Sequence, residues 1–340
     1  MKKTKTSLLL ALFILAFITY SFSASTPCVF SGVEKIVAVG DLHGDYKNFV
    51  KIIKGTGLVD SDLHWRGGKA YLVQMGDILD RGPDARQIFD LMIELEKEAE
   101  EAGGKVLMLI GNHEELNLTG ISFDYPDYMT VEQFVSFLPD KYREQKEKEL
   151  KRKLRGDERS IRSFWKEMIR NNRDARQNYL TNFNKKYGDW ILEHHAVIKI
   201  NDVIFAHGGI SEKYSSWKLE AINDQLRMEL NDLRWAAVYS RPLHNPRIQV
   251  AYKRDGPLWY REFALENEEL FQDEVDRILH NLDAQYMVIA HTPRLVLTIN
   301  DMRRFQGKVW IIDTGISEVY GGHLSALIIE NGNFSLWGEQ

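Results

Sequence analysis

The sequence predicts an α/β fold with mixed β-sheets, and three observations indicate it. Short runs rich in apolar and β-branched residues recur along the chain, and amphipathic helical patterns lie between several of them. Two pairs of these runs are joined by Asn-Asp or Asn-Gly, dipeptides typical of tight turns between antiparallel strands. Between residues 124 and 194 a charged helical pattern replaces the strands. We therefore expect parallel and antiparallel strands together, with one helical insertion.

Residues 1–23 have the layout of a secretory signal peptide. A lysine-rich start precedes an apolar stretch from Leu8 to Ile18, and Ser21 and Ser23 provide small side chains before a cut after Ser23. The apolar stretch is short for a membrane span, which needs roughly 20 residues. We expect a periplasmic or secreted protein without stable membrane insertion after cleavage, and an uncleaved anchor is the alternative.

The composition of the full chain indicates which class of protein it belongs to. Of 340 residues, 44% are hydrophobic and 27% charged, which is ordinary for a globular chain and leads us to expect a single domain over 30–340. The net charge of −5 argues against a general nucleic-acid binder. Cys28 is the only cysteine, so no internal disulfide can form and the fold depends on its core and on any bound metal.

The expected strands and helices alternate along the chain. A long amphipathic helix is expected from Asp84 to a Gly pair ending at Gly104. Hairpins are expected in "IKINDVIF" and in "LIIENGNFSLW". The other expected strands are "KIVAVGD", "KAYLVQMGD", "KVLMLIGN", "QYMVIAHT" and "KVWIIDTG".

The helical insertion, about residues 124–194, is strongly basic in its middle. Lys141 to Arg176 contains fourteen Lys or Arg and seven Asp or Glu, a local net charge of +7. A solvated helical surface is the simpler interpretation, and a basic lid or docking surface for an anionic substrate is the alternative.

Several expected strands end in side chains that bind metals or carry protons. Each of five apolar runs stops, mostly at a small residue, and is followed by Asp, Asn or His. These residues are Asp41 and His43, Asp77 with Asp80 and Arg81 behind it, Asn112 and His113, His207, and His291. In open α/β sheets a functional site lies beyond the carboxyl ends of the strands, so we expect these side chains to meet.

Oxygen and imidazole donors of this kind suit Mn, Fe, Co or Zn, and the set is large enough for two ions. The expected ligands are Asp41 and His43 for the first ion and Asn112, His207 and His291 for the second. Asp77 is expected to bridge the two ions. A single "DLH" or "HGG" would more often cap a loop, but five such strand ends in order predict a dinuclear metal site.

The segments "GDLHGD", "GDILDRG", "GNHE", "AHGG" and "AHT" resemble the signature of the calcineurin-like metallophosphoesterases, close to the phosphoprotein phosphatase branch. The chain departs from the eukaryotic Ser/Thr members, because it has "LIGNHE" and no "SAPNYC" loop. Its "DGPLWYRE" and "IIDTGISEVYGGHLSAL" are similar to the Shewanella-like protein phosphatases, a group that includes protein-tyrosine phosphatase activity. The family fold is a four-layer α/β/β/α sandwich of two mixed sheets.

The resemblance also implies roles for individual residues. It makes Asp41, His43, Asp77, Asn112, His207 and His291 ligands of two divalent metal ions. His113 becomes the candidate acid and Asp80 the residue that orients it. Arg81 binds phosphate, and Arg261 is a second phosphate-binding arginine unless it is only a surface residue. Glu114 and Glu115 are interpreted as structural.

The function implied is hydrolysis of phosphoproteins or phosphopeptides, with phosphotyrosine preferred, by attack of a metal-bridging hydroxide. A diadenosine tetraphosphatase or other phosphodiesterase is the first alternative. A non-catalytic protein that binds metal or phosphopeptides is the second, although no ligand and no acid is missing from the motifs.

Overall fold

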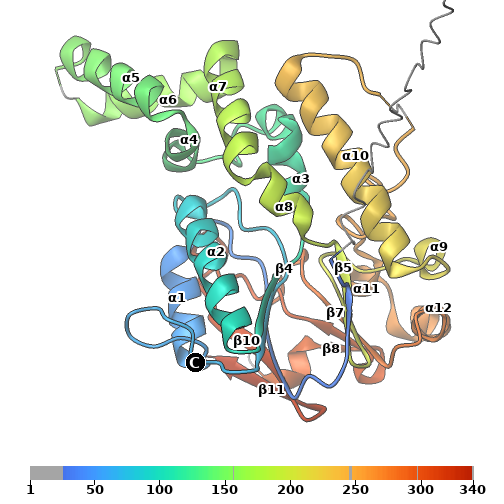
Figure 1. Ribbon diagram of the computed structural model, residues 1–340. Coiled ribbons are helices and arrows are strands. Elements are labelled where there is room, and N and C mark those ends of the chain that lie inside the picture. Colours follow the sequence, from blue (N-terminus) through green and yellow to red (C-terminus); the bar gives the residue numbers. More distant parts are fainter. Residues whose placement is uncertain (1–25, 156, 245–246, 297, 339–340) are drawn as a thin grey trace, which may run out of the picture.

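The computed structural model describes residues 26–155, 157–244, 247–296 and 298–338 (Figure 1). The expected signal peptide, residues 1–23, lies outside the described residues. Within the described ranges, the structure has no helix that is both long enough and apolar enough to cross a membrane.

Two mixed sheets form the centre of the molecule. In the six-stranded sheet the order is β1 (Val29–Phe30), β5 (Val197–Ile200), β6 (Val203–Ala206), β7 (Tyr286–Ile289), β9 (Val309–Ile311) and β8 (Arg303–Arg304). In the five-stranded sheet it is β11 (Asn333–Gly338), β10 (Ser325–Glu330), β2 (Lys35–Val39), β3 (Tyr71–Gln74) and β4 (Lys105–Met108). Each sheet contains a parallel trio, β6-β7-β9 or β2-β3-β4, together with antiparallel pairs.

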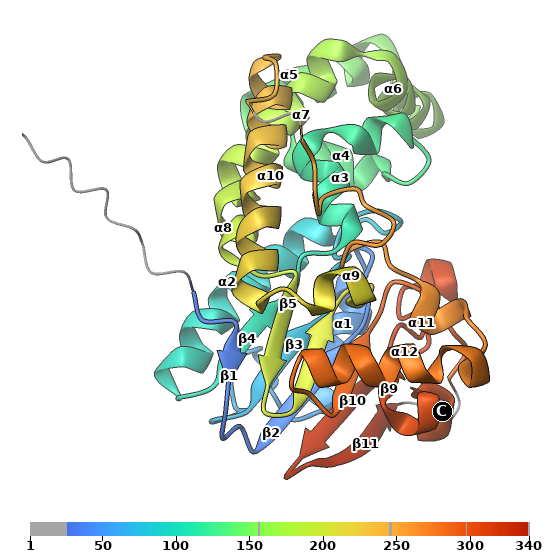
Figure 2. The same ribbon diagram turned by 90° about the vertical axis from the view of Figure 1, so that its right-hand side faces the viewer.

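Helices cover the outer faces of both sheets. On the side of the five-stranded sheet lie α1 (Tyr46–Gly55) and α2 (Ala85–Glu101), and α12 (Glu268–Asn281) lies on the opposite side with α9 (Glu212–Ser215) (Figure 2). Short helical turns complete the connections: η1 (Ile121–Asp124), α11 (Glu262–Leu265), η3 (Ile299–Met302), η4 (Phe305–Gly307) and η5 (Glu318–Tyr320). This arrangement confirms the predicted sandwich of two mixed sheets.

The hairpins form at the predicted turns. The Asn-Asp pair after Ile200 joins β5 to β6, and the Asn-Gly pair after Glu330 joins β10 to β11. Asn201 and Asn331 have φ of 53° and 49°, the left-handed conformation that Asn tolerates better than most residues. The Asn at each turn therefore fixes the register of its hairpin.

A mostly helical region stands above the sandwich (Figures 1 and 2). It contains α3 (Asn112–Thr119), α4 (Val131–Phe137), α5 (Asp140–Lys153), α6 (Glu158–Asn171), α7 (Arg173–Phe183), the π-helical turn η2 (Asn184–Gly188), α8 (Asp189–Glu193) and α10 (Leu219–Tyr239). Its core is aromatic: Phe134, Phe137, Tyr179, Phe183 and Tyr187 are fully buried or nearly so. By contrast, Leu150 is the only buried residue of the basic helix α5, so this helix is a solvated surface.

Candidate metal and phosphate site

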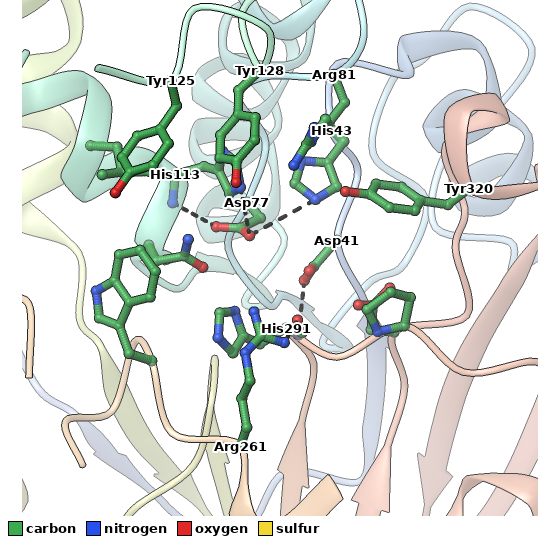
Figure 3. A pocket seen from close by; sticks show the side chains of 15 residues that line it. Asp41, His43, Asp77, Arg81, His113, Tyr125, Tyr128, Arg261, His291 and Tyr320 are labelled. Carbon is green, nitrogen blue, oxygen red and sulfur yellow. Dashed lines mark hydrogen bonds and ion pairs between the residues drawn. The ribbon is translucent and has the colours of Figure 1, made fainter. Parts of the chain in front are cut away.

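The predicted polar residues meet at the edge where the carboxyl ends of both parallel trios come together (Figure 3). Strands β2, β3 and β4 of one sheet lead to Asp41 and His43, to Asp77 and to Asn112. Strands β6 and β7 of the other sheet lead to His207 and His291. All six residues are at most 5% exposed. The two sheets thus bring together residues up to 250 positions apart in the chain.

The backbone turns sharply where these strands end. The left-handed region of φ is occupied by His43 (42°), Asp77 (54°), Asp80 (67°), Arg81 (69°) and His291 (66°). Such conformations cost free energy in residues with a Cβ and cluster at functional sites. Gly76, with φ of 94°, allows close approach, because a Cβ there would lie 2.6 Å from the backbone nitrogen of Gly111.

One group of ligand atoms converges on His207. Its Nε2 lies 3.0 Å from Asn112 Oδ1, 3.1 Å from His291 Nδ1 and 3.4 Å from Asp77 Oδ2. Its Nδ1 lies 2.8 Å from the Met75 carbonyl oxygen, to which it donates, so Nε2 keeps a lone pair for a ligand. These are the residues predicted for the second ion, together with the bridging carboxylate.

A second group of side chains approaches the same Asp77 oxygen, Oδ2. His43 donates from Nδ1 to the Leu79 carbonyl oxygen at 3.0 Å, which leaves Nε2 3.9 Å from Asp77 Oδ2. His113 Nε2 lies 3.9 Å from the same oxygen. Asp41 lines the same cavity, with Oδ1 3.7 Å from His207 Nδ1. Asp77 therefore faces both groups, as a bridging ligand must.

Negative charge accumulates beneath the cavity. Burial and then the neighbouring charges of Asp313 and Asp77 raise the pKa of Asp41 well above its usual range. Burial alone would also raise the pKa of Asp77, but the imidazoles of His207 and His113 outweigh it and hold that pKa well below its usual range. Divalent cations would neutralise such crowded carboxylates, and the buried His291 Nε2 has no hydrogen-bond partner. The donor set thus fits a dinuclear metal site.

Asp313 was not among the residues predicted from the sequence. It follows β9, is 3% exposed and lines the cavity. The strand "KVWIIDTG" carries the same signal as the others, an apolar run that ends in Asp, so the pattern used for the other strand ends could have identified it.

His113 and Asp80 form a close pair beside the cavity. His113 Nδ1 lies 2.6 Å from Asp80 Oδ2, and its ring is buried with Nε2 turned toward Asp77. Burial would lower the pKa of His113, but Asp77 and Asp80 outweigh it and raise that pKa to about 9. A protonated imidazole at the edge of the cavity could donate a proton to a leaving group.

The two glutamates after His113 form hydrogen bonds with the segments that carry Asp77 and Trp259. Glu114, fully buried, accepts hydrogen bonds from the backbone N–H groups of Asp77, Ile78 and Gly111 at 2.8–2.9 Å. Glu115 accepts from the backbone of Tyr252 and from the Trp259 indole. Burial raises the pKa of Glu115 to about 8. Glu114 therefore fixes the loop that carries Asp77, and Glu115 fixes Trp259.

The two predicted arginines face the cavity from different sides (Figure 3). The Arg81 guanidinium carbon stands 3.7 Å from the centre of the Tyr128 ring, and its Nε has no hydrogen-bond partner. Arg261 Nη1 donates to the His291 carbonyl oxygen at 2.8 Å and to Thr292 Oγ1 at 2.9 Å. Arg261 is thus held against a candidate metal ligand, which the sequence alone did not establish.

Aromatic rings, none of which was predicted as a site residue, surround the mouth of the cavity of about 210 Å³. Tyr125 and Tyr128 stack on each other with centroids 5.2 Å apart. Tyr128 stands beside His113, Tyr320 beside His43 and Trp259 beside His291, at centroid distances of 5.5, 5.3 and 6.1 Å. The polar floor is therefore enclosed by an aromatic wall, which we define as Tyr125, Tyr128, Trp259 and Tyr320.

Comparison with known proteins supports this description. The sequence model of the calcineurin-like phosphoesterase family matches residues 34–295 of this chain. The chain is 27% identical over 288 residues to Shewanella-like protein phosphatase 1 of Plasmodium berghei (strain Anka), covering 83% of this chain and 67% of that protein. It is 30% identical over 245 residues to Shewanella-like protein phosphatase 2 of Arabidopsis thaliana, covering 70% of this chain and 60% of that protein. These findings confirm the resemblance predicted from the motifs.

Solved structures with the same fold include cold-active protein-tyrosine phosphatases. One structure of this enzyme superposes with a TM-score of 0.67 at 24% identity and covers 93% of this chain and 81% of its own. Another, from a psychrophilic Shewanella species, gives a TM-score of 0.64 at 26% identity and covers 93% and 83%. Both support the sandwich architecture described above.

Proposed function

Because this chain belongs to the calcineurin-like phosphoesterase family, we propose that it is a phosphomonoesterase of phosphoproteins that prefers phosphotyrosine. Similarity to two Shewanella-like protein phosphatases and to a cold-active protein-tyrosine phosphatase supports a phosphoprotein substrate. The preference for phosphotyrosine rests on the cavity itself.

The observation that carries the proposal is the contrast between the floor and the wall of the cavity. The floor offers two arginines and the ligand groups for a phosphate, whereas the wall offers aromatic rings. A phenyl ring attached to the phosphate would pack against Tyr125, Tyr128 or Trp259, with aromatic pairs worth about 0.5–1.5 kcal/mol beyond area burial. Phosphoserine carries no such ring and would leave the wall without a partner.

The side chains divide the chemistry among them. Asp41, His43, Asp77, Asn112, His207 and His291 would hold two divalent ions such as Mn, Zn, Fe or Co. Bound ions of this kind supply Lewis-acid chemistry and make a nucleophile available at neutral pH. Arg81 and Arg261 bind and stabilise the non-bridging phosphate oxygens. His113, held by Asp80, donates a proton from Nε2 to the leaving oxygen.

A substrate panel tests the proposal. Manganese-loaded protein would be assayed on a phosphotyrosine peptide, the matched phosphoserine peptide and diadenosine tetraphosphate. We expect kcat/KM for the phosphotyrosine peptide to exceed that for phosphoserine by about tenfold, which corresponds to roughly 1.4 kcal/mol. Preference for the dinucleotide would support the phosphodiesterase alternative, and metal binding without any turnover would support a non-catalytic binder.

We also propose that the protein acts in the periplasm or outside the cell. The lysine-rich start and short apolar stretch of residues 1–23 support this location. Intact-mass measurement of protein recovered from the native cell envelope should give a first residue between Ala24 and Cys28. A mature protein that retains Met1 would contradict the export proposal.

A further inference from the structure

A fully buried polar network connects Asp80 to the helical region above the sandwich. Asp80, Asn117, Gln133 and Tyr179 are all 0% exposed. Asp80 Oδ2 accepts from His113 Nδ1 at 2.6 Å and from Asn117 Nδ2 at 3.0 Å. Asp80 Oδ1 accepts from Gln133 Nε2 at 2.9 Å. His113 and Asn117 come from α3 and Gln133 comes from α4, so two separate helices hold one carboxylate.

The direction of each hydrogen bond in this network is determined. The backbone N–H of Asp80 can only donate, and it donates to Gln133 Oε1 at 2.6 Å, so the amide nitrogen of Gln133 must face the carboxylate. Tyr179 donates to Asn117 Oδ1 at 2.7 Å, and Asn117 Nδ2 also donates to the His113 carbonyl oxygen at 2.9 Å. Both amides therefore present donors to Asp80.

These donor directions determine which nitrogen of the His113 imidazole faces Asp80 as a donor. Because Asp80 receives amide donors on both oxygens, it acts as an acceptor toward His113, whose Nδ1 must then carry the proton. The atom that faces the cavity and Asp77 is Nε2. The network thus keeps Nδ1 protonated and fixes the orientation of the ring, so that in the protonated imidazole Nε2 is the nitrogen that presents a proton to the cavity.

We propose that Gln133 and Tyr179 are positioning residues that hold His113 in its proton-donating geometry, an inference that rests on the role of His113 in the proposed function. Without Gln133 the Asp80 carboxylate would lose a buried hydrogen-bond partner, and without the Tyr179 hydroxyl the Asn117 amide that donates to Asp80 would lose its own, so the carboxylate could rotate. Small misplacements of a catalytic group slow a reaction strongly, so effects should appear although neither residue touches the substrate. The helical region then contributes to chemistry as well as to the shape of the cavity.

A closely matched control exists within the same aromatic core. Tyr179 stacks on Phe134 and on Phe183 at 5.4 and 5.9 Å, and Tyr187 packs against Phe137 and Phe183 at 5.5 and 6.1 Å. The Tyr187 hydroxyl donates to Asp90 at 2.6 Å, which lies outside the Asp80 network. Tyr179→Phe and Tyr187→Phe each remove one hydroxyl from the same core, but only the first removes a partner of Asn117.

The dependence of the kcat/KM loss on the leaving group distinguishes a positioning role from a general loss of protein stability. Manganese-loaded variants would be assayed on phenyl phosphate and on p-nitrophenyl phosphate, whose leaving group needs less protonation. Tyr179→Phe should lower kcat/KM about tenfold for phenyl phosphate and about twofold for p-nitrophenyl phosphate, a part of the full general-acid effect. Tyr187→Phe should change both by less than about twofold. Equal losses on both substrates in Tyr179→Phe, or no loss, would overturn the proposal.

A spectroscopic measurement keeps the inference separate from the proposed function. In zinc-loaded protein labelled with ¹⁵N-histidine, two-bond ¹H–¹⁵N correlations should show His113 protonated at Nδ1. Gln133→Met, which keeps side-chain length but removes both hydrogen bonds, should shift or broaden this signal, and Tyr187→Phe should not. An unchanged His113 signal in Gln133→Met overturns the inference, whatever the activity. Absence of phosphatase activity with the expected shift would reject the proposed function alone and leave the positioning intact.

Discussion

The floor and the wall of the cavity are built by different parts of the molecule. Each predicted metal ligand of the floor follows a strand of one of the two sheets and is at most 5% exposed. The wall comes from connecting segments outside the sheets, and Tyr125 and Tyr320 are 47% and 37% exposed. Sheet register fixes the floor, whereas the wall can vary without disturbing the sandwich. Chemistry should therefore depend on the floor and substrate choice on the wall.

The largest effect should come from the residue at the centre of the floor. Asp77→Asn replaces the carboxylate that faces both ligand groups, so we expect kcat/KM to fall by at least about 10⁴-fold with loss of bound metal. Metal analysis and assay of the same sample measure this. Two tightly bound ions with near-normal turnover would rule out a bridging role.

Within the floor, the proton donor and a metal ligand should respond differently to the leaving group. His113→Ala should slow phosphoserine hydrolysis by about 10²–10⁴-fold and phosphotyrosine hydrolysis by less, because a phenol with a pKa of about 10 departs more easily than an alkoxide. His207→Ala should slow both by similar factors. Values of kcat/KM on both peptides and p-nitrophenyl phosphate provide the measurement. Uniform losses in His113→Ala with metal retained would show that His113 is not the acid.

Loss of the Glu114 hydrogen bonds beneath the floor should lower the free energy of unfolding. Glu114→Gln turns an acceptor of backbone N–H groups into a mixed donor and acceptor, and we expect the free energy of unfolding to fall by about 2–3 kcal/mol. Glu98→Gln is the control, because the Glu98 side chain is more exposed and its carboxylate accepts from His64 and from the Trp65 backbone. It should cost less than about 1 kcal/mol. Denaturant unfolding of both variants decides whether Glu114 has this role.

The smallest effect should come from the wall. Tyr125→Ala removes one stacked ring, so kcat/KM for a phosphotyrosine peptide should fall about fivefold, roughly 1 kcal/mol, while the phosphoserine peptide changes by less than about twofold. Tyr239→Ala provides the control, since Tyr239 is 66% exposed on α10 and does not line the cavity. Equal losses on both peptides would make Tyr125 a structural residue and remove support for the phosphotyrosine preference.

Much of the floor was predictable because its signal is local. A buried strand followed by Gly and then Asp, Asn or His can be identified one segment at a time, and both hairpins follow from two-residue turns. Asp313 carries the same local pattern, an apolar strand that ends in Asp, although it was not predicted as a site residue. The position of Arg261 depends on tertiary contacts, because its hydrogen bonds to His291 and Thr292 span about thirty residues of chain.

The sequence by itself determined the sandwich, its strand ends and the kind of ligand each strand presents, because backbone period and turn chemistry are encoded within a few neighbouring residues. Only the tertiary structure decided which rings enclose the cavity and which buried amides hold Asp80. Tyr128, Gln133 and Tyr179 have no local pattern that distinguishes them from core or surface residues. Their roles arise from packing between α3, α4, α7 and the strand ends, and such packing depends on contacts between segments distant in the chain.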